Sequence, residues 1–387
     1  MKNAVQGKNQ TLARKENQKL VFELFKKHDL SASEVSNILK LSQSGTKKII
    51  DDLIAKNILT ETTPIKHFTS GRMPMTLTLN QRYGIIACVD FFDKEIFISD
   101  LKNNILFSAS IEINDKVSDA DILRCAEILQ SIIAKPRFSR FQLLAISIVV
   151  LGKFDTASSQ PVFSYAFSDI TINLKTYFSQ IFTCPVTLKN DLHFAIIAEQ
   201  EYGCLSHLGR EINCCYLNIG EGITASYLIN GKLYCGSHGL AGEIGFNITD
   251  FENPTSTLAD HADRRSLLSF LHNSEEDIPL PDEFSLREVA ELYKKDEPHV
   301  TRTVDKVATY IALAVKNICD ILDCETFVLN GSLLVFGDKF IDKIIQALKN
   351  FPYVKTSIVK AKLGTNATKL GAIELARNLV FDNIINK

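Results

Sequence analysis

Apolar residues recur at helical spacing along the first sixty residues of the chain. Four of them indicate a first amphipathic helix: Leu20, Val21, Leu24 and Phe25. The next segment, Ser31-Ala32-Ser33-Glu34, has the pattern of a capping box, in which a serine hydroxyl and a glutamate carboxylate each accept an N–H at a helix start. Ser42 can cap a third helix that runs to about Lys56. The spacing predicts a three-helix head.

The third predicted helix has one apolar and one polar face. Ile49, Ile50 and Leu53 gather on the apolar side. The polar side begins at the N-terminal end, where a recognition helix meets base edges and phosphates. Six residues there are predicted to bind DNA: Ser42, Gln43, Ser44, Thr46, Lys47 and Lys48.

Two alternating segments follow, in ILTETTPIKHFTSGRMPMTLTLN, and flank a turn that contains Ser70-Gly71-Arg72. This pattern predicts a β-wing whose tip residue, Arg72, enters a minor groove. The alternative is an ordinary three-helix bundle with a solvated polar face.

From Gly84 the pattern changes to apolar runs separated by short polar turns. GIIACVDFF, EIFISDL and ILFSASIEI are followed by a helical stretch near 119–134 and by LLAISIVVLG. A weaker copy starts at Cys214 with CCYLNIG and ITASYLI. Three strands and then helices, repeated about 130 residues later, predict two α/β lobes with a ligand cleft between them.

Charge divides the chain into two parts. Residues 1–82 carry 14 Lys and Arg against 7 Asp and Glu, although the whole chain of 387 residues has a net charge of −2. The head is therefore basic and the body acidic, which predicts that only the head binds a polyanion. No apolar run reaches the roughly 18 residues of a membrane span, so we expect a cytoplasmic protein without membrane contact. The nine cysteines form no C-x-x-C pair, which favours buried thiols over a metal site.

These motifs resemble, in their order along nearly the whole chain, the ROK family of sugar-responsive repressors and sugar kinases. The resemblance rests on the helix-turn-helix, the SGRMP wing, VLG, KNDLHFAIIAE, LNIGEGI, INGKLYCGSHGLAGEIGF, FVLNGS and KLGAIELA. It implies an α/β, actin-like ATPase (ribonuclease H-like) body of two lobes behind a winged-helix DNA-binding domain. The implied domains are 1–80 for the head, 81–190 with the C-terminal helix 366–387 for the first lobe, and 191–365 for the second lobe, which binds sugar and dimerises.

The resemblance also implies a sugar site. In the family's kinases the aspartate that matches Asp191 is the general base, the asparagine that matches Asn190 bonds the sugar ring, and Glu243 matches a sugar-binding glutamate. A carboxylate beside an amide suits adjacent hydroxyls, and the glycines around Glu243 let the backbone fold tightly. We add Phe246, whose ring can stack on a sugar. The alternative is a plain glycine-rich turn with a surface glutamate.

Phe246 stands where family members usually carry a zinc-binding histidine, and residues 247–272 contain no cysteine. Phenylalanine cannot ligate zinc, so we expect no metal and no cofactor. His238 and His261 are the alternative ligands considered. The stretch 250–282 is predicted to be a loose surface loop.

The two turns that clamp phosphates in the family's kinases are altered here. The first keeps Asp90 but carries two phenylalanines and Asp93, and the second, Gly220-Glu221-Gly222, gains a carboxylate. Bulk and negative charge oppose a triphosphate, so we expect no kinase activity.

Together these features predict a cytoplasmic, homodimeric repressor of carbohydrate genes that binds operator DNA and a sugar or sugar derivative. One alternative is an ATP-dependent sugar kinase with an appended DNA-binding head. Another is a repressor whose body is controlled by a protein partner.

Overall fold

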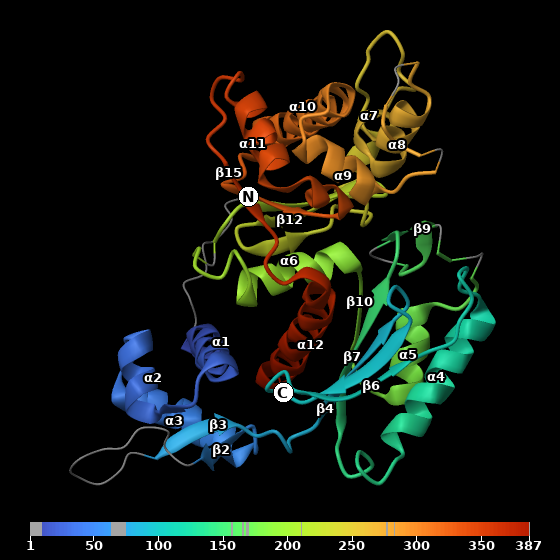
Figure 1. Ribbon diagram of the computed structural model, residues 1–387. Coiled ribbons are helices and arrows are strands. Elements are labelled where there is room, and N and C mark those ends of the chain that lie inside the picture. The colour runs from blue at the N-terminus through green and yellow to red at the C-terminus, as the bar shows by residue number, and fades with distance from the viewer. Residues whose placement is uncertain are drawn as a thin grey trace, which may run out of the picture. The chain divides into compact units, whose positions relative to one another are not determined.

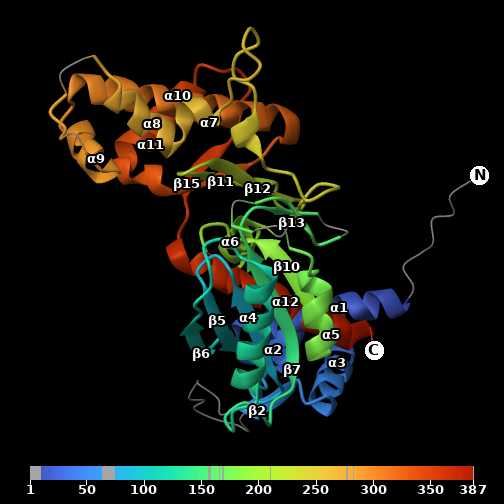
Figure 2. The same cartoon turned by 90° about the vertical axis from the view of Figure 1, so that its right-hand side faces the viewer.

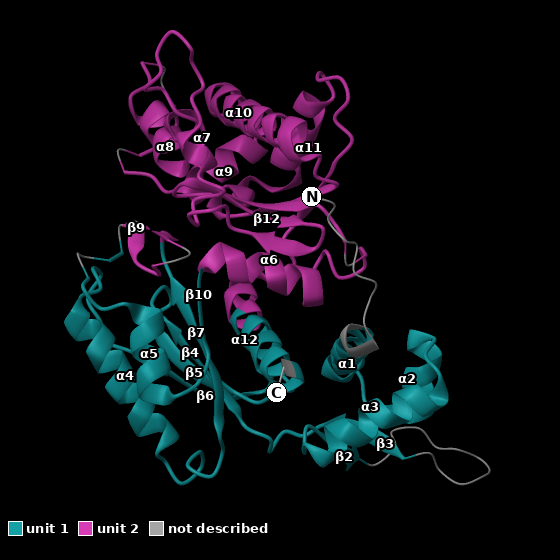
Figure 3. Ribbon diagram, turned by 180° about the vertical axis from the view of Figure 1, so that it is seen from behind, with its two compact units in different colours: residues 1–151, 164–189, 372–387 teal, residues 152–163, 190–371 magenta. Residues whose placement is uncertain are grey.

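The computed structural model describes residues 10–62, 75–155, 158–164, 166–167, 170–209, 211–275, 278–281 and 283–386. The chain divides into two compact units, coloured separately in Figure 3. Unit 1 comprises residues 1–151, 164–189 and 372–387, and unit 2 comprises residues 152–163 and 190–371. Unit 1 thus groups the head with the first lobe, and unit 2 takes in 152–163, which the sequence placed in the first lobe. Within the described ranges no helix is long and apolar enough to cross a membrane.

The head of unit 1 contains three helices and a small antiparallel sheet of order β1-β3-β2 (Figure 1). Its elements are α1 (Gln10–Lys27), β1 (Leu30–Ser31), α2 (Ala32–Leu39), α3 (Gln43–Ala55), β2 (Leu59–Thr62) and β3 (Thr76–Leu79). The capping box is present: Ser31 Oγ accepts from Glu34 N, and the Glu34 carboxylate accepts from Ser31 N at 2.8 Å. The three predicted helices and the two predicted strands are therefore present, and this arrangement is consistent with a winged helix-turn-helix.

The rest of unit 1 is built on a five-stranded sheet of order β10-β7-β4-β5-β6. Its strands are β4 (Ile85–Asp90), β5 (Glu95–Ser99), β6 (Ile105–Ser110), β7 (Leu143–Val150) and β10 (Val186–Asn190). Helices α4 (Asp119–Ile133) and α5 (Leu174–Phe182) lie on one side of it, and most of α12 (Ala367–Asn386) lies on the other (Figure 1). Because both faces are covered, every residue of β4 is buried.

Unit 2 has a second sheet, of order β13-β12-β11-β14-β15. Its strands are β11 (Cys214–Ile219), β12 (Ile223–Ile229), β13 (Lys232–Tyr234), β14 (Thr326–Asn330) and β15 (Ser357–Lys360). A two-stranded sheet, β8 (Lys153–Phe154) with β9 (Pro161–Phe163), belongs to the same unit. The helices of unit 2 are α6 (Asp191–Tyr202), α7 (Ala259–Ala262), α8 (Arg264–His272), α9 (Leu286–Lys294), α10 (Pro298–Leu322) and α11 (Gly337–Leu348).

The two large sheets share one plan. In each, the first three strands pair antiparallel and the fourth joins the first in parallel, as β7 does with β4 and β14 does with β11. The fifth strand, β10 or β15, then flanks the fourth. The predicted repetition of one α/β lobe is confirmed.

Alternation along β11 explains how its sheet is covered on both faces. Cys215 and Leu217 join the apolar cluster formed with α10 and α11, whereas Cys214 and Tyr216 pack with α6. Figure 2 shows α10 and α11 on one face of this sheet and α6 on the other. Successive side chains of a strand point to opposite faces, so a continuous apolar run such as CCYL is needed here.

The prediction of a loose loop over 250–282 was wrong in part. This stretch contains α7 and α8, and Leu267 and Leu271, four residues apart on α8, are both buried. Asp263 starts α8, because its Oδ1 accepts from Ser266 N at 2.7 Å. A short apolar stripe and one aspartate cap were the signals in the sequence.

The cysteines behave as small apolar residues. Six of the nine are buried, three are half-buried, and all nine are free thiols. Burial raises the pKa of the Cys184 thiol to about 12, so it stays protonated at neutral pH. The predicted buried thiols are present at those six positions.

Candidate functional site

Helix α3 presents its polar face to solvent. Ser42, at its N-cap, accepts from Gly45 N at 3.1 Å. The side chains of Gln43, Ser44, Lys47 and Lys48 are exposed, as is Ser42. On the opposite side, Ile50 and Leu53 are buried in the head. The exposed set combines amide, hydroxyl and ammonium groups, which are the donors that phosphates and base edges accept from.

Thr46 departs from this set. Its side chain is 0% exposed, because it lies on the inner side of α3 one turn before Ile50. A side chain buried in the head cannot touch a DNA groove, so we correct the sequence prediction and withdraw Thr46 from the proposed contacts.

Of the predicted wing, only the two strands lie within the described residues. β2 and β3 pair antiparallel from Leu59 opposite Leu79 to Thr62 opposite Thr76. The predicted tip, with Arg72, lies outside the described residues. Its role in DNA binding stays a prediction.

The four residues predicted to bind sugar all belong to unit 2. Asn190 caps α6, since its Oδ1 accepts from His193 N at 2.9 Å, and Asp191 is the first residue of that helix. This cap uses the amide oxygen of Asn190 and leaves its NH₂ group out of the cap. The helix start therefore holds the asparagine in one orientation and sets the half-buried Asp191 beside it.

Glu243 forms an ion pair that the sequence did not reveal. Lys153 Nζ lies 3.0 Å from Glu243 Oε1 and 3.3 Å from Ala241 O. The lysine side chain is 4% exposed and the glutamate side chain 24% exposed. A buried ammonium needs a partner, and this pair fixes the Glu243 carboxylate while leaving part of it open to solvent. The signal in the sequence was a lysine set between the apolar run LLAISIVVLG and Phe154.

The glycines before and after Glu243 are required by close packing on β12. Gly242 has a φ of +101°, and a Cβ there would lie 2.0 Å from Ala225 O. The Gly242 carbonyl also accepts from Ala225 N at 2.8 Å. Gly242 therefore lets the loop lie along the strand and carry Glu243 at a fixed place, as the sequence predicted.

Phe246 ends a short 3₁₀ helix, Ile244–Phe246, and is 58% exposed. Its ring is therefore accessible to a ligand.

The two histidines considered as metal ligands have other neighbours. His261 Nε2 lies 2.7 Å from Ser256 Oγ, and its ring stacks on Tyr310. His238 Nδ1 lies 3.9 Å from Asp155 Oδ2. Among the described residues, no group of histidines and cysteines gathers at ligand distance in this part of unit 2.

The first altered phosphate turn, in unit 1, is closed by its own aspartate. Asp90 Oδ1 accepts from Phe92 N at 2.8 Å and from Asp93 N at 2.9 Å. The Phe91 side chain is buried and packs edge-on against Phe167, whereas Phe92 is partly exposed. One carboxylate oxygen and two backbone N–H groups are thereby used within the turn, which leaves fewer donors for an anion.

The second altered turn, in unit 2, carries an ion pair. Arg264 donates from its guanidinium to the Glu221 carboxylate, and Arg264 N donates to Gly220 O at 2.8 Å. The sequence analysis missed Arg264, which is 43 residues from Glu221. The glutamate and the arginine neutralise each other at this turn.

Comparisons with known proteins agree with this architecture. The sequence profile described as "ROK family" matches residues 126–379. A xylose repressor of Bacillus spizizenii is 24% identical over 378 residues, covering 94% of this chain and 95% of the repressor. A crystal structure of a ROK family transcriptional regulator, a homolog of the E. coli MLC protein, superposes with a TM-score of 0.79 at 17% identity, covering 97% of this chain and 98% of that one. A ROK hexokinase from Thermus thermophilus, with a TM-score of 0.61 at 19% identity, covers 76% of this chain and 97% of its own.

Proposed function

The chain belongs to the ROK family, and from this premise we propose that it is a sugar-responsive repressor of carbohydrate genes. The observation that carries the proposal is the exposed polar face of α3 on a head that precedes a two-lobed ROK body. The regulator covers 97% of the chain, but the hexokinase covers only 76%, as expected if the head distinguishes the two groups. The similarity to a xylose repressor extends over 94% of this chain and 95% of the repressor, which supports a sugar as effector.

We propose that the protein acts as a homodimer on operator DNA in the cytoplasm. Two copies of α3 then read two half-sites, and their spacing sets the separation of the half-sites. The effector site is formed by Asn190, Asp191 and Glu243, with Phe246 as a stacking surface. D-xylose is the first sugar to test.

The proposal is tested by selecting DNA fragments from a random pool with the wild-type chain and measuring their affinity by fluorescence anisotropy. The same protein is then titrated with D-xylose, other pentoses and hexoses while its thermal midpoint is followed, since a ligand of the folded state raises that midpoint. Selective DNA binding that changes with one of the sugars supports the proposal. An absence of sequence preference rules out the repressor. A DNA-binding chain that ignores every sugar points to control by a protein partner.

Replacing both Lys47 and Lys48 by alanine is expected to weaken DNA binding equally for all sequences. Each lost phosphate contact flattens the plot of log K against log salt by about 0.9, so the slope should fall by about 2. The adjacent exposed lysines Lys294 and Lys295 of α9 and its C-cap serve as the control, because their replacement makes the same change in net charge. An unchanged slope in the Lys47 and Lys48 variant contradicts the assignment of α3 as the DNA reader.

Replacing Glu243 by alanine is expected to reduce sugar affinity by about 10- to 150-fold, because a hydrogen bond to a charged group is worth about 1.5–3 kcal/mol. Isothermal titration with the sugar found above measures the change. Glu252, an exposed glutamate of the same unit, is the control. If the Glu243 and Glu252 variants bind the sugar with equal affinity, Glu243 is not part of the effector site.

We further propose that the chain transfers no phosphate. The closed turn at Asp90 supports this, because phosphoryl transfer depends on backbone N–H groups that are free to hold the phosphates, and two of them are used within this turn. Incubation with ATP, Mg²⁺ and the sugar panel should release no ADP above that formed without sugar. Sugar-dependent turnover would establish the kinase alternative.

A further inference from the structure

One helix belongs to both units. α12 runs from Ala367 to Asn386, and the boundary between the units falls inside it, after Gly371. Its first turn is therefore part of unit 2, and the remainder is part of unit 1, which also contains the head (Figure 3). A continuous helix transmits displacement along its axis because its backbone hydrogen bonds keep it stiff.

In unit 2, the first turn of α12 lies directly against α6. A Cβ on Gly371 would lie 1.9 Å from Phe194 O, so the backbones of the two helices touch at this point. α6 is the helix that Asn190 caps and Asp191 begins. Asn190 and Asp191, two of the residues proposed to bind sugar, are thus one helical turn from the contact with α12.

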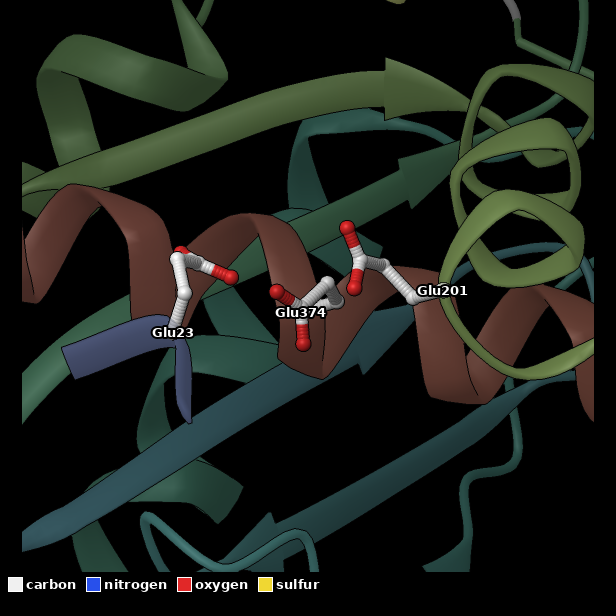
Figure 4. A group of neighbouring side chains, drawn as sticks. All are labelled: Glu23, Glu201 and Glu374. Atoms are coloured by element: carbon white, nitrogen blue, oxygen red, sulfur yellow. The ribbon is translucent and has the colours of Figure 1, made fainter. Parts of the chain in front are cut away.

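In unit 1, the later part of α12 holds the head through buried charges. Lys26 of α1 is ion-paired with Glu374 of α12, and their side chains are 1% and 0% exposed. Lys26 Nζ also lies 2.6 Å from Glu23 Oε2 and donates to Asn378 Oδ1 at 3.1 Å. Figure 4 shows Glu23 and Glu374 on α1 and α12; the third labelled residue, Glu201, belongs to unit 2.

Aromatic packing continues this junction along α12. The rings of Phe22 and Phe381 stack with centroids 3.8 Å apart and planes 10° apart. At the solvent edge, Lys19 Nζ lies 3.3 Å from Asp382 Oδ1, with both side chains about half exposed. The interior of the junction between α1 and α12 is therefore buried, and its edge is exposed to solvent.

Helix α1 then contacts the DNA-reading helix. Gln18 Nε2 donates to Asp52 Oδ2 of α3 at 3.0 Å, and Gln18 is itself buried. Val21 and Phe25 of α1 are fully buried, as expected for residues that pack inside the head. A displacement of α1 is consequently passed to α3 by direct contacts.

We propose that Lys26 and Glu374 are positioning residues that fix the head to α12, and that α12 carries the effector-dependent change from α6 to α3. This inference rests on the proposed function. Separating Lys26 from Glu374 would break a buried charge-assisted contact, although Glu23 stays beside Lys26 and Arg377 stays beside Glu374, so α1 and α12 are expected to move as one body. Binding of a sugar at the start of α6 would shift the contact at Gly371, and the head would follow.

The test replaces Lys26 by methionine, which keeps most of the length of the side chain but removes its charge. The affinity for the selected DNA is measured with and without the sugar that binds the wild type. Effector coupling typically spans about 5- to 150-fold. In the variant this ratio is expected to fall to within about twofold of unity, while isothermal titration still shows sugar binding. Lys19→Ala, at the exposed rim of the same junction, should keep the wild-type ratio because exposed ion pairs contribute little.

A Lys26→Met variant that folds, binds sugar and keeps the wild-type ratio overturns the inference and leaves the proposed function intact. Should the variant not fold, hydrogen exchange of the wild-type chain decides. The backbone amides of α1 and of residues 372–382 should change protection together when sugar is added. A DNA response without any such change overturns the inference. A wild-type chain whose DNA affinity ignores all sugars contradicts the proposed function, and this inference falls with it.

Discussion

Replacing Glu199 by alanine is expected to lower the free energy of unfolding by about 3–5 kcal/mol, the largest effect we foresee for a single substitution. The Glu199 side chain is buried, on α6. Its Oε2 accepts from Cys204 N at 2.7 Å, and its Oε1 accepts from Lys362 N and Leu363 N, both at 2.8 Å. Removing the fully buried carboxylate leaves these three N–H groups without their acceptor.

Urea denaturation followed by far-ultraviolet circular dichroism measures the loss, with the exposed Glu211→Ala variant as the control. Glu199→Gln should lie between wild type and Glu199→Ala, because the amide retains one acceptor oxygen and adds a donor that faces other donors. Equal midpoints for Glu199→Ala and Glu211→Ala would show that the three contacts do not hold the segment before α12 against α6.

Replacing Gly242 by alanine is expected to lower sugar affinity by at least about tenfold, and stability along with it. The backbone conformation at φ +101° costs a side-chain-bearing residue about 1–3 kcal/mol, and the new Cβ would lie 2.0 Å from Ala225 O. The loop can relieve this overlap only by leaving β12, which displaces the adjacent Glu243. A displacement that costs 1.4 kcal/mol of binding free energy is a factor of ten in affinity.

Gly222→Ala is the matched control, because Gly222 lies in the same unit and a Cβ there meets nothing within 4 Å. Isothermal titration measures affinity, and thermal melts without sugar measure stability. If Gly242→Ala binds sugar as tightly as Gly222→Ala does, the loop around Glu243 is not part of the effector site.

Local patterns in the sequence predicted the elements well. The capping box at Ser31 and the cap at Ser42 involve residues three apart, so their consequences can be deduced from adjacent letters. The repeated run of three strands predicted two lobes, and both sheets have that plan. Helix α8 was missed because its apolar face consists of little more than Leu267 and Leu271.

Contacts between residues far apart in the chain could not be predicted from the sequence. Lys153 and Glu243 are 90 positions apart, and nothing in either neighbourhood indicates the other. The same is true of Lys26 and Glu374, which are 348 positions apart. Burial of Thr46 was missed because its polar side chain suggested the solvent face, whereas its position one turn before Ile50 places it inside.

The shared membership of α12 has a consequence for biosynthesis. The head leaves the ribosome before the body does, but the part of α12 that contacts Lys26 is translated only after residues 190–371 of unit 2. Domains generally fold as they emerge, so until residues 372–382 are made the head has only Glu23 beside Lys26 and nothing stacked on Phe22. Chains cut short before 372 would carry a head that lacks its contacts with Glu374 and Phe381.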